Sequence, residues 1–302
     1  MRSFTFLVNP TSGGGTAPAA AAAVARILER AGATVVVAHT ESAAAVPVIA
    51  EDAISHDSVV VSTGGDGMLS SVAGVVSRLG GTLGVVPAGR GNDFARQLGL
   101  PDEAEALAAI LLDSTPTAID LLSWQAAGSP ERIVAGSVYA GVDARSSEIV
   151  DTVRWMPDRL QYPYAALRGL AGYQPGHYRV SVDGQVAEYD AATVVVANSG
   201  YYGKGMHIAP SAAVDDGVLD VVVITAASRL QLIRKMPQVY DGSHVALDGV
   251  HVLRGSRVEI QGDARTPIPV GGDGEPIGVL PALSAAPATV TLLPGALLLL
   301  VG

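Results

Sequence analysis

Cysteine is absent from this 302-residue chain, so disulfides, iron–sulfur clusters and thiolate zinc sites are excluded. Positive charge is scarce, because 19 Lys and Arg residues stand against 29 Asp and Glu residues, giving a formal net charge of −10. A nucleic acid requires a basic surface, so it is not expected as a partner. No apolar run approaches the ~20 residues that cross a bilayer. These absences predict a protein that is soluble or peripheral to a membrane.

The length and apolar content of the chain predict a globular protein with two domains. Nearly half of the residues are hydrophobic, and 302 residues allow two domains at roughly 100–200 residues each. The first expected strand begins almost at Met1, with no cleavable apolar segment before it. Together with the lack of cysteine, this predicts a cytoplasmic location.

Residues 1–122 alternate short β-branched runs with longer helical patterns. Strands are expected at 4–8, 34–38, 58–61 and 82–86, and helices at 18–30, 43–54, 68–79 and 103–112. Such alternation is typical of βαβ units around a parallel sheet. The pattern predicts a Rossmann-like α/β domain with a parallel sheet.

From residue 123 the pattern changes to short, often alternating segments separated by turn residues. Strands are expected at 133–139, 178–183, 192–198, 218–224, 257–261 and 267–270, with helical stretches at 146–173 and 228–239. This predicts an antiparallel β domain over 123–290. The apolar strand expected at 296–301 has no neighbour in sequence to pair with, and residues 291–302 are assigned to the first domain.

Three clusters of glycine with polar residues directly follow strands of the first domain. They are Asn9–Gly15, Gly64–Gly67 and Gly89–Asp93. Ligands of a parallel α/β sheet bind beyond the carboxyl ends of its strands, where backbone amides converge on phosphate. An ordinary tight turn explains one such cluster, but three within about 95 residues indicate a phosphate site.

The motifs of the chain, taken together, resemble the diacylglycerol kinase catalytic-domain family of bacterial lipid kinases, which is related to sphingosine and ceramide kinases. The resemblance depends on Asn9-Pro10-x-Ser12-Gly13, Gly64-Gly65-Asp66-Gly67, Gly89-x-Gly91-Asn92-Asp93, Asp215-Asp216-Gly217 and Gly272-Asp273-Gly274-Glu275. It runs nearly end to end. It implies a nucleotide-binding α/β domain, an antiparallel β-sandwich, a cleft between them, and a last strand that returns to the first domain.

The resemblance also implies ATP and Mg²⁺ as cofactors and assigns the residues that contact the nucleotide. These are Asn9, Ser12, Gly13, Thr40, Gly64, Gly65, Asp66, Gly67, Met68, Leu69, Ser70, Arg90, Asn92 and Asp93. Met68 and Arg90 stand where the family usually has threonine, and the Arg90 guanidinium is itself a phosphate partner. Asp66 is expected either to hold the magnesium of ATP or to cap the helix after it. Thr40 is expected either to contact the nucleotide or to cap the next helix.

The resemblance places the proton acceptor at Glu275, with Asp273 as an alternative base or a ligand of metal-bound water. Both lie in a segment that reads as a turn, and a solvated acidic turn is the alternative interpretation. A structural magnesium ion is implied at Asp216 and at the carbonyls of Ala213 and Val218. The alternative for Asp216 is a simple hairpin turn.

The predicted function is ATP-dependent phosphorylation of a lipid hydroxyl, with diacylglycerol as acceptor and phosphatidic acid as product. An NAD kinase-like phosphotransferase and a non-catalytic nucleotide- or lipid-binding regulator remain open. The lipid implies contact with the inner face of a membrane, and a homodimer is left open. Two stretches, 154–168 and 229–235, mix basic with apolar or aromatic residues, and either a membrane interface or packing on the sheet explains them.

Overall fold

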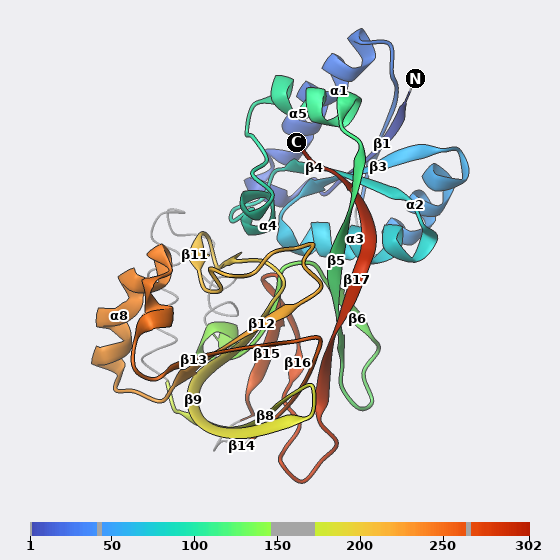
Figure 1. Cartoon of the computed structure of the whole chain (residues 1–302). Helices are drawn as coiled ribbons and strands as arrows, with labels where there is room; N and C mark the ends of the chain where they lie inside the picture. Colours follow the sequence, from blue (N-terminus) through green and yellow to red (C-terminus); the bar gives the residue numbers. More distant parts are fainter. Residues whose placement is uncertain (1, 41–43, 146–172, 264–266) are drawn as a thin grey trace. The chain divides into compact units, whose positions relative to one another are not determined.

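A computed structural model describes residues 2–40, 44–145, 173–263 and 267–302. The chain divides into two compact units, Met1–Leu121 with Pro294–Gly302 and Leu122–Leu293. Strands β5 (Pro116–Gln125) and β17 (Ala288–Leu300) run from one unit into the other (Figure 1). The expected helical stretch at 146–173 lies, except for Tyr173, outside the described residues, as does the basic and aromatic stretch at 154–168.

The first unit is the predicted parallel α/β fold. Its strands are β1 (Ser3–Val8), β2 (Thr34–His39), β3 (Ser58–Gly64) and β4 (Thr82–Pro87), in the spatial order β4-β3-β1-β2. Its longer helices are α1 (Ala17–Arg30), α2 (Ala45–Ser55), α3 (Asp66–Leu79) and α5 (Ala104–Asp113). A short 3₁₀ turn, η1 (Ser12–Gly14), and a short helix, α4 (Asp93–Gln97), follow β1 and β4.

The core of the first unit explains why these elements form. Phe4 and Phe6 of β1 are fully buried with Leu28 of α1 and Leu111 of α5. The end of β17 completes the sheet, since Leu298 and Leu299 pair in parallel with Thr82 and Leu83 of β4. The expected return of the last strand is therefore confirmed.

The second unit is the predicted antiparallel β domain, with more strands than the sequence indicated. Its strands are β6 (Arg132–Val134), β7 (Ser137–Gly141), β8 (Gly176–Val182), β9 (Gln185–Ala197), β10 (Tyr201–Tyr202), β11 (Met206–His207), β12 (Leu219–Thr225), β13 (Val250–Gly255), β14 (Arg257–Asp263), β15 (Pro269–Gly272) and β16 (Glu275–Val279). Helix α8 (Arg229–Asp241) and the 3₁₀ turn η2 (Ser243–Ala246) lie between β12 and β13. The prediction of a single strand at 133–139 is wrong, because β6 and β7 are two separate strands.

Strand β9 organises the sheet of the second unit. Its first half pairs with β8, and its second half pairs with β7 and β12. The burial pattern changes accordingly, from exposed and half-buried residues to a continuous buried run from Ala191 to Ala197. The turn between β8 and β9 is formed by Asp183 and Gly184, both with positive φ, as a tight Asp-Gly hairpin requires.

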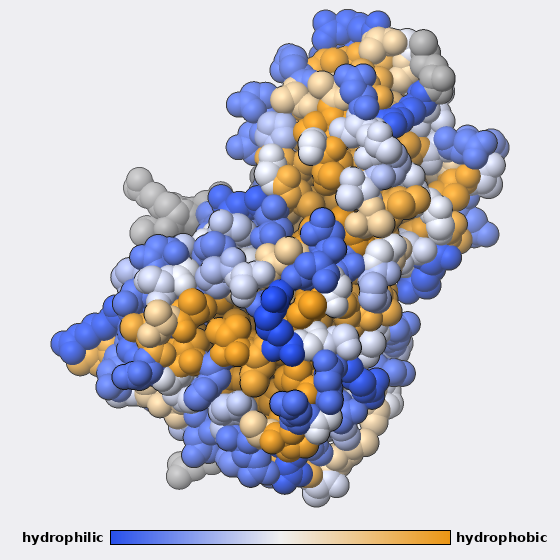
Figure 2. Space-filling view, viewed as in Figure 1, coloured by the Kyte–Doolittle hydropathy of each residue, from blue (hydrophilic) through white to orange (hydrophobic). Residues whose placement is uncertain are grey.

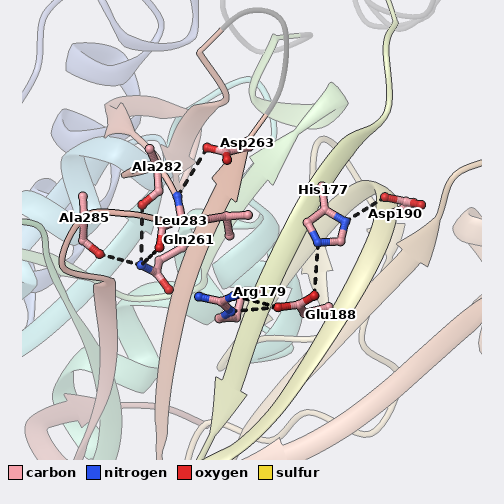
Figure 3. A network of polar contacts seen from close by, with 9 residues as sticks. All are labelled: His177, Arg179, Glu188, Asp190, Gln261, Asp263, Ala282, Leu283 and Ala285. Atoms are coloured by element: carbon pink, nitrogen blue, oxygen red, sulfur yellow. Dashed lines mark hydrogen bonds and ion pairs between the residues drawn. The ribbon is translucent and has the colours of Figure 1, made fainter.

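Charged side chains line the exposed face of β8 and β9 (Figure 3). The His177 ring lies between Asp190, 2.9 Å from Nδ1, and Glu188, 3.3 Å from Nε2, and Glu188 also accepts a bond from Arg179. The hydrogen bond to Asp190 raises the pKa of His177 above its usual value. In the same view, Gln261 of β14 donates to carbonyls of the loop that precedes β17. These contacts hold exposed strands and loops in place.

Candidate functional site

The three glycine loops of the first unit meet at the carboxyl ends of β1, β3 and β4. A Cβ added to Gly89 would overlap the Cα of Gly65, which is backbone and cannot rotate away. A Cβ on Gly13 would lie 2.6 Å from the carbonyl oxygen of Ala88, and one on Gly64 would lie 3.2 Å from Ser12 Oγ. At Gly89 and Gly13 the neighbouring loop presents its backbone, so glycine is required there, whereas the neighbouring loop meets Gly64 through a side chain.

Asp66 joins two of these loops through its side chain. Its Oδ1 accepts a hydrogen bond from the Phe94 amide at 3.0 Å, and its Oδ2 accepts one from the Asp93 amide at 3.2 Å. Burial raises the pKa of the Asp66 carboxyl, while these amides act in the opposite direction. The cap of α3 itself is Gly65, so the interpretation of Asp66 as the cap of its own helix is wrong.

The N-terminus of α3 supplies the donors of the site. The first amides of an α-helix have no acceptor within the helix, and the helix dipole makes this end partly positive. In α3 these amides belong to residues that directly follow the close contact of the glycine loops. A phosphate group fits this end, and the Asp66 carboxylate beside it repels a bare phosphate unless a cation lies between them.

Asn9, Thr40 and Asn92 hold the loops in shape. Asn9 Oδ1 accepts bonds from the Thr11 amide and hydroxyl, and Asn92 Oδ1 accepts one from the Gly89 amide at 2.8 Å. The Thr40 hydroxyl donates to the Val8 carbonyl, whereas the cap position of α2 is Ala44. The interpretation of Thr40 as the helix cap is therefore wrong.

The remaining residues assigned to the nucleotide differ in exposure. Leu69 and Ser70 of α3 are buried, as is Asp93, whose carboxylate lies 4.0 Å from Arg96. Met68 and Arg90 are partly exposed. The buried side chains belong to the interior of the first unit, so Leu69 and Ser70 would reach a ligand through their backbone.

In the second unit, Asp273 is held by three consecutive backbone amides. Its carboxylate accepts bonds at 2.9–3.2 Å from the amides of Ala135, Gly136 and Ser137. Asp273 and Gly274 form the two-residue turn between β15 and β16, both with positive φ. The Gly274 amide donates to the Tyr139 hydroxyl at 3.0 Å. The turn is thus fixed in place by its own aspartate.

Glu275 lies beyond this turn and is exposed. It is the first residue of β16 and pairs with Gly272, so the reading of Glu275 as a turn residue is wrong. The Asp273 anchor positions β16, and the exposed Glu275 carboxylate on this strand can accept a proton. The Asp273 carboxylate is instead engaged by amides.

Asp216 has a different cation from the one that the resemblance implies. Its Oδ2 lies 2.7 Å from Nη2 of Arg254, and its Oδ1 accepts a bond from the Val218 amide. Nε of Arg254 also lies 3.5 Å from the fully buried Asp220 carboxylate, to which Ser211 is hydrogen-bonded. The Asp216 loop does not join two paired strands, because β12 pairs with β9 and β13, so the hairpin reading is also wrong.

Both oxygens of Asp216 have partners within the protein. The Arg254 guanidinium supplies the positive charge at Oδ2, and the Val218 amide donates to Oδ1. The magnesium site that the resemblance assigns to Asp216 and to the carbonyls of Ala213 and Val218 stays a prediction, and the structure offers Arg254 as the cation in its place. Among the described residues, no group of three His, Cys, Asp or Glu side chains is arranged to hold a metal ion.

We expect the melting temperature of the protein to be the same in magnesium and in EDTA, and Arg254→Ala to lower it in both. The loss leaves Asp216 and the buried Asp220 without a cation, and domains of this size lose about 2–4 °C per kcal/mol. Thermal melting of both proteins checks this. Magnesium should then recover part of the loss only in Arg254→Ala. A wild-type melting temperature that rises with magnesium would contradict the assignment.

Comparisons with known proteins place the chain in one family. Residues 3–124 match the model of the diacylglycerol kinase catalytic domain, and residues 136–301 match the YegS C-terminal NAD kinase beta sandwich-like domain. A diacylglycerol kinase of Mycobacterium tuberculosis is 33% identical over 96% of this chain and 94% of its own length. A diacylglycerol kinase of Bacillus subtilis is 26% identical over 93% of this chain and 92% of its own.

The solved structures agree with the fold. A diacylglycerol kinase of Bacillus anthracis aligns over 100% of this chain and 97% of its own, with a TM-score of 0.73 and 18% identity. The α/β unit with its glycine loops, the β-sandwich and the two matched domain models lead to one conclusion: the chain belongs to the diacylglycerol kinase-like family of lipid kinases.

Proposed function

We propose that the protein transfers the γ-phosphoryl group of ATP to a lipid hydroxyl, with diacylglycerol as acceptor and phosphatidic acid as product. The observation that carries the proposal is the convergence of three glycine loops on the N-terminus of α3, with Asp66 bridging two of them. Phosphoryl transfer depends chiefly on positioning and charge, which such a cradle provides.

The proposal assigns the phosphates of ATP to the first unit. Backbone amides at the start of α3 donate to phosphate oxygens, and Arg90 offers a guanidinium from the neighbouring loop. Asp66 faces the cation that accompanies the nucleotide. A bound magnesium ion would neutralise charge on the transferring phosphate.

The proposal assigns proton acceptance to the second unit. Glu275 is exposed at the start of β16 and takes the proton of the lipid hydroxyl, while Asp273 holds the turn before it. A positioned general base contributes about 10²–10⁴-fold to a rate. We therefore expect Glu275→Gln to lower turnover by that order and to leave nucleotide affinity unchanged.

The test is a transfer assay with purified protein, ATP labelled on its γ-phosphate, magnesium, mixed micelles that contain diacylglycerol, ceramide or sphingosine, and a separate reaction with NAD. Label in diacylglycerol, lost in Glu275→Gln, supports the proposal. Label in NADP instead supports an NAD kinase, to whose β-sandwich the matched C-terminal model refers. A protein that binds ATP but labels nothing above background is a non-catalytic regulator, and the proposal then fails.

A further inference from the structure

Helix α8 exposes large apolar side chains on its outward face. Leu230, Ile233 and Tyr240 are 55%, 40% and 46% exposed, and with exposed Pro237 they recur at the 3–4 spacing of one helix face. The surface where Figure 1 places α8 shows hydrophobic patches next to hydrophilic protrusions (Figure 2). The helix therefore carries an exposed apolar stripe, made of Leu230, Ile233, Pro237 and Tyr240.

The opposite face fixes the orientation of α8. Val239 is buried with Tyr202, Ile208 and Val222, and Leu232 packs against Tyr173. Ser228 and Gln231 form a capping box at the start of the helix, so the helix is stabilised without an external partner. The stripe is thus presented outward by a preformed helix, and Leu232, which the sequence grouped with it, belongs to the packed face.

The positive charge of α8 indicates which kind of partner the stripe binds. α8 carries Arg229, Arg234 and Lys235 against one acidic residue, Asp241, although the whole chain has a net charge of −10. Arg229 donates to the Tyr173 carbonyl and Lys235 to the Asp248 carbonyl, whereas Arg234 is exposed on the same helix as the stripe. Long basic side chains beside exposed Leu, Ile and Tyr residues are typical of helices that lie at an anionic lipid surface. A stripe one side chain wide is also narrow for a stable protein interface, which buries about 800 Å² on each partner.

We infer that α8 docks the protein on anionic phospholipid membranes, with Leu230, Ile233 and Tyr240 entering the interface and Arg234 pairing with lipid phosphates. Since the acceptor under the proposed function is itself a membrane lipid, the choice of a membrane as the partner rests on that function. Docking brings the second unit to the surface where its acceptor resides. Among the described residues no helix is long and apolar enough to span a bilayer.

The test measures binding of the full chain to phosphatidylcholine vesicles with and without phosphatidylglycerol, by co-sedimentation. We expect binding that requires phosphatidylglycerol and weakens at high salt. Leu230→Ser and Arg234→Glu should each reduce the partition coefficient by roughly tenfold. Matched controls on other elements are Val186→Ser, at an exposed valine of β9, and Arg132→Glu, at an exposed arginine of β6, and both should bind as wild type.

Two outcomes overturn the inference. One is equal vesicle binding by wild type and the α8 variants. The other is a dimer in gel filtration that the same variants dissociate, which would make the stripe an interface between copies. Turnover on a dispersed short-chain diacylglycerol separates this inference from the proposed function. If the α8 variants lose vesicle binding but still phosphorylate the dispersed diacylglycerol, docking is supported. If the wild type binds vesicles but phosphorylates no lipid, the kinase assignment alone is refuted.

Discussion

Replacing Gly89 by alanine is expected to destabilise the first unit and to abolish nucleotide binding. The new Cβ would overlap the Cα of Gly65, so one glycine loop must move away from the other. Overpacking against backbone typically costs about 1–3 kcal/mol and occasionally more. The shift would also break the bond from the Gly89 amide to Asn92 and separate Asp66 from the amides of α4. Thermal melting and calorimetric titration with an ATP analogue measure the two effects.

Two other glycines of the same unit serve as controls for this prediction. Gly65→Ala places its Cβ 3.2 Å from Gly89 Cα, a contact that a small shift relieves, so its effect should be weaker than that of Gly89→Ala. Gly99→Ala meets nothing within 4 Å but has a φ of +64°. It should lose about 1–2 kcal/mol through backbone strain and keep its affinity for the nucleotide. Equal affinity in Gly89→Ala and Gly99→Ala would refute the role of the glycine contact.

The first unit was predictable because its signals are local and periodic. β-branched runs alternating with helical patterns located β1, β2, β3 and β4 to within a few residues, and parallel strands bring their carboxyl ends to one edge. The convergence of the glycine loops follows from that topology. The hydrogen bonds that amides of α4 donate to Asp66 do not follow from it, since this helix has only five residues and begins 27 positions away.

The second unit was less predictable because its key contacts join distant residues. Ile133–Tyr139 reads as one apolar strand, yet β6 and β7 are separated where the amides of residues 135–137 bind Asp273, 136–138 positions along the chain. Arg254 lies on β13, which no periodic pattern located. The signal available in the sequence was that Asp216 and Asp220 need a basic residue to neutralise them. The sequence does not show which strands lie side by side, so it could not identify Arg254 as that residue.

The two aspartates, Asp66 and Asp273, show the same use of a carboxylate. Each accepts bonds from consecutive backbone amides that are distant in sequence, and each lies at the start of a segment that the proposed reaction needs, α3 in one case and the strand that begins at Glu275 in the other. Hydrogen bonds from amides to a charged group are stronger than those between neutral groups. Each Gly-Asp-Gly motif therefore contributes an anchor as well as a turn.

Removing the Asp273 anchor should lower stability and turnover together. In Asp273→Ala the amides of Ala135, Gly136 and Ser137 lose their common acceptor, and bonds to a charged acceptor contribute about 1.5–3 kcal/mol each. At the lower value the three bonds together contribute about 4.5 kcal/mol, so we expect the melting temperature to fall by roughly 9–18 °C, at about 2–4 °C per kcal/mol. Turnover should fall on the order of 10²-fold, because Glu275 is displaced by the released turn. Melting curves and the transfer assay measure both.

Gly136→Ala distinguishes an anchor from a base at Asp273, because it displaces the carboxylate without removing it. Its Cβ would lie 2.7 Å from Asp273 Oδ1, so we expect the same fall in turnover as in Asp273→Asn, with the nucleotide affinity unchanged. Ser137→Ala is the matched control, since the Ser137 hydroxyl is buried without a hydrogen-bond partner among the residues that the structure describes, and only its amide serves the anchor. If Gly136→Ala kept wild-type turnover while Asp273→Asn lost it, the carboxylate itself would be the proton acceptor. In that case Glu275→Gln should retain most of the activity, and the acidic limb of the pH profile would disappear with Asp273 alone.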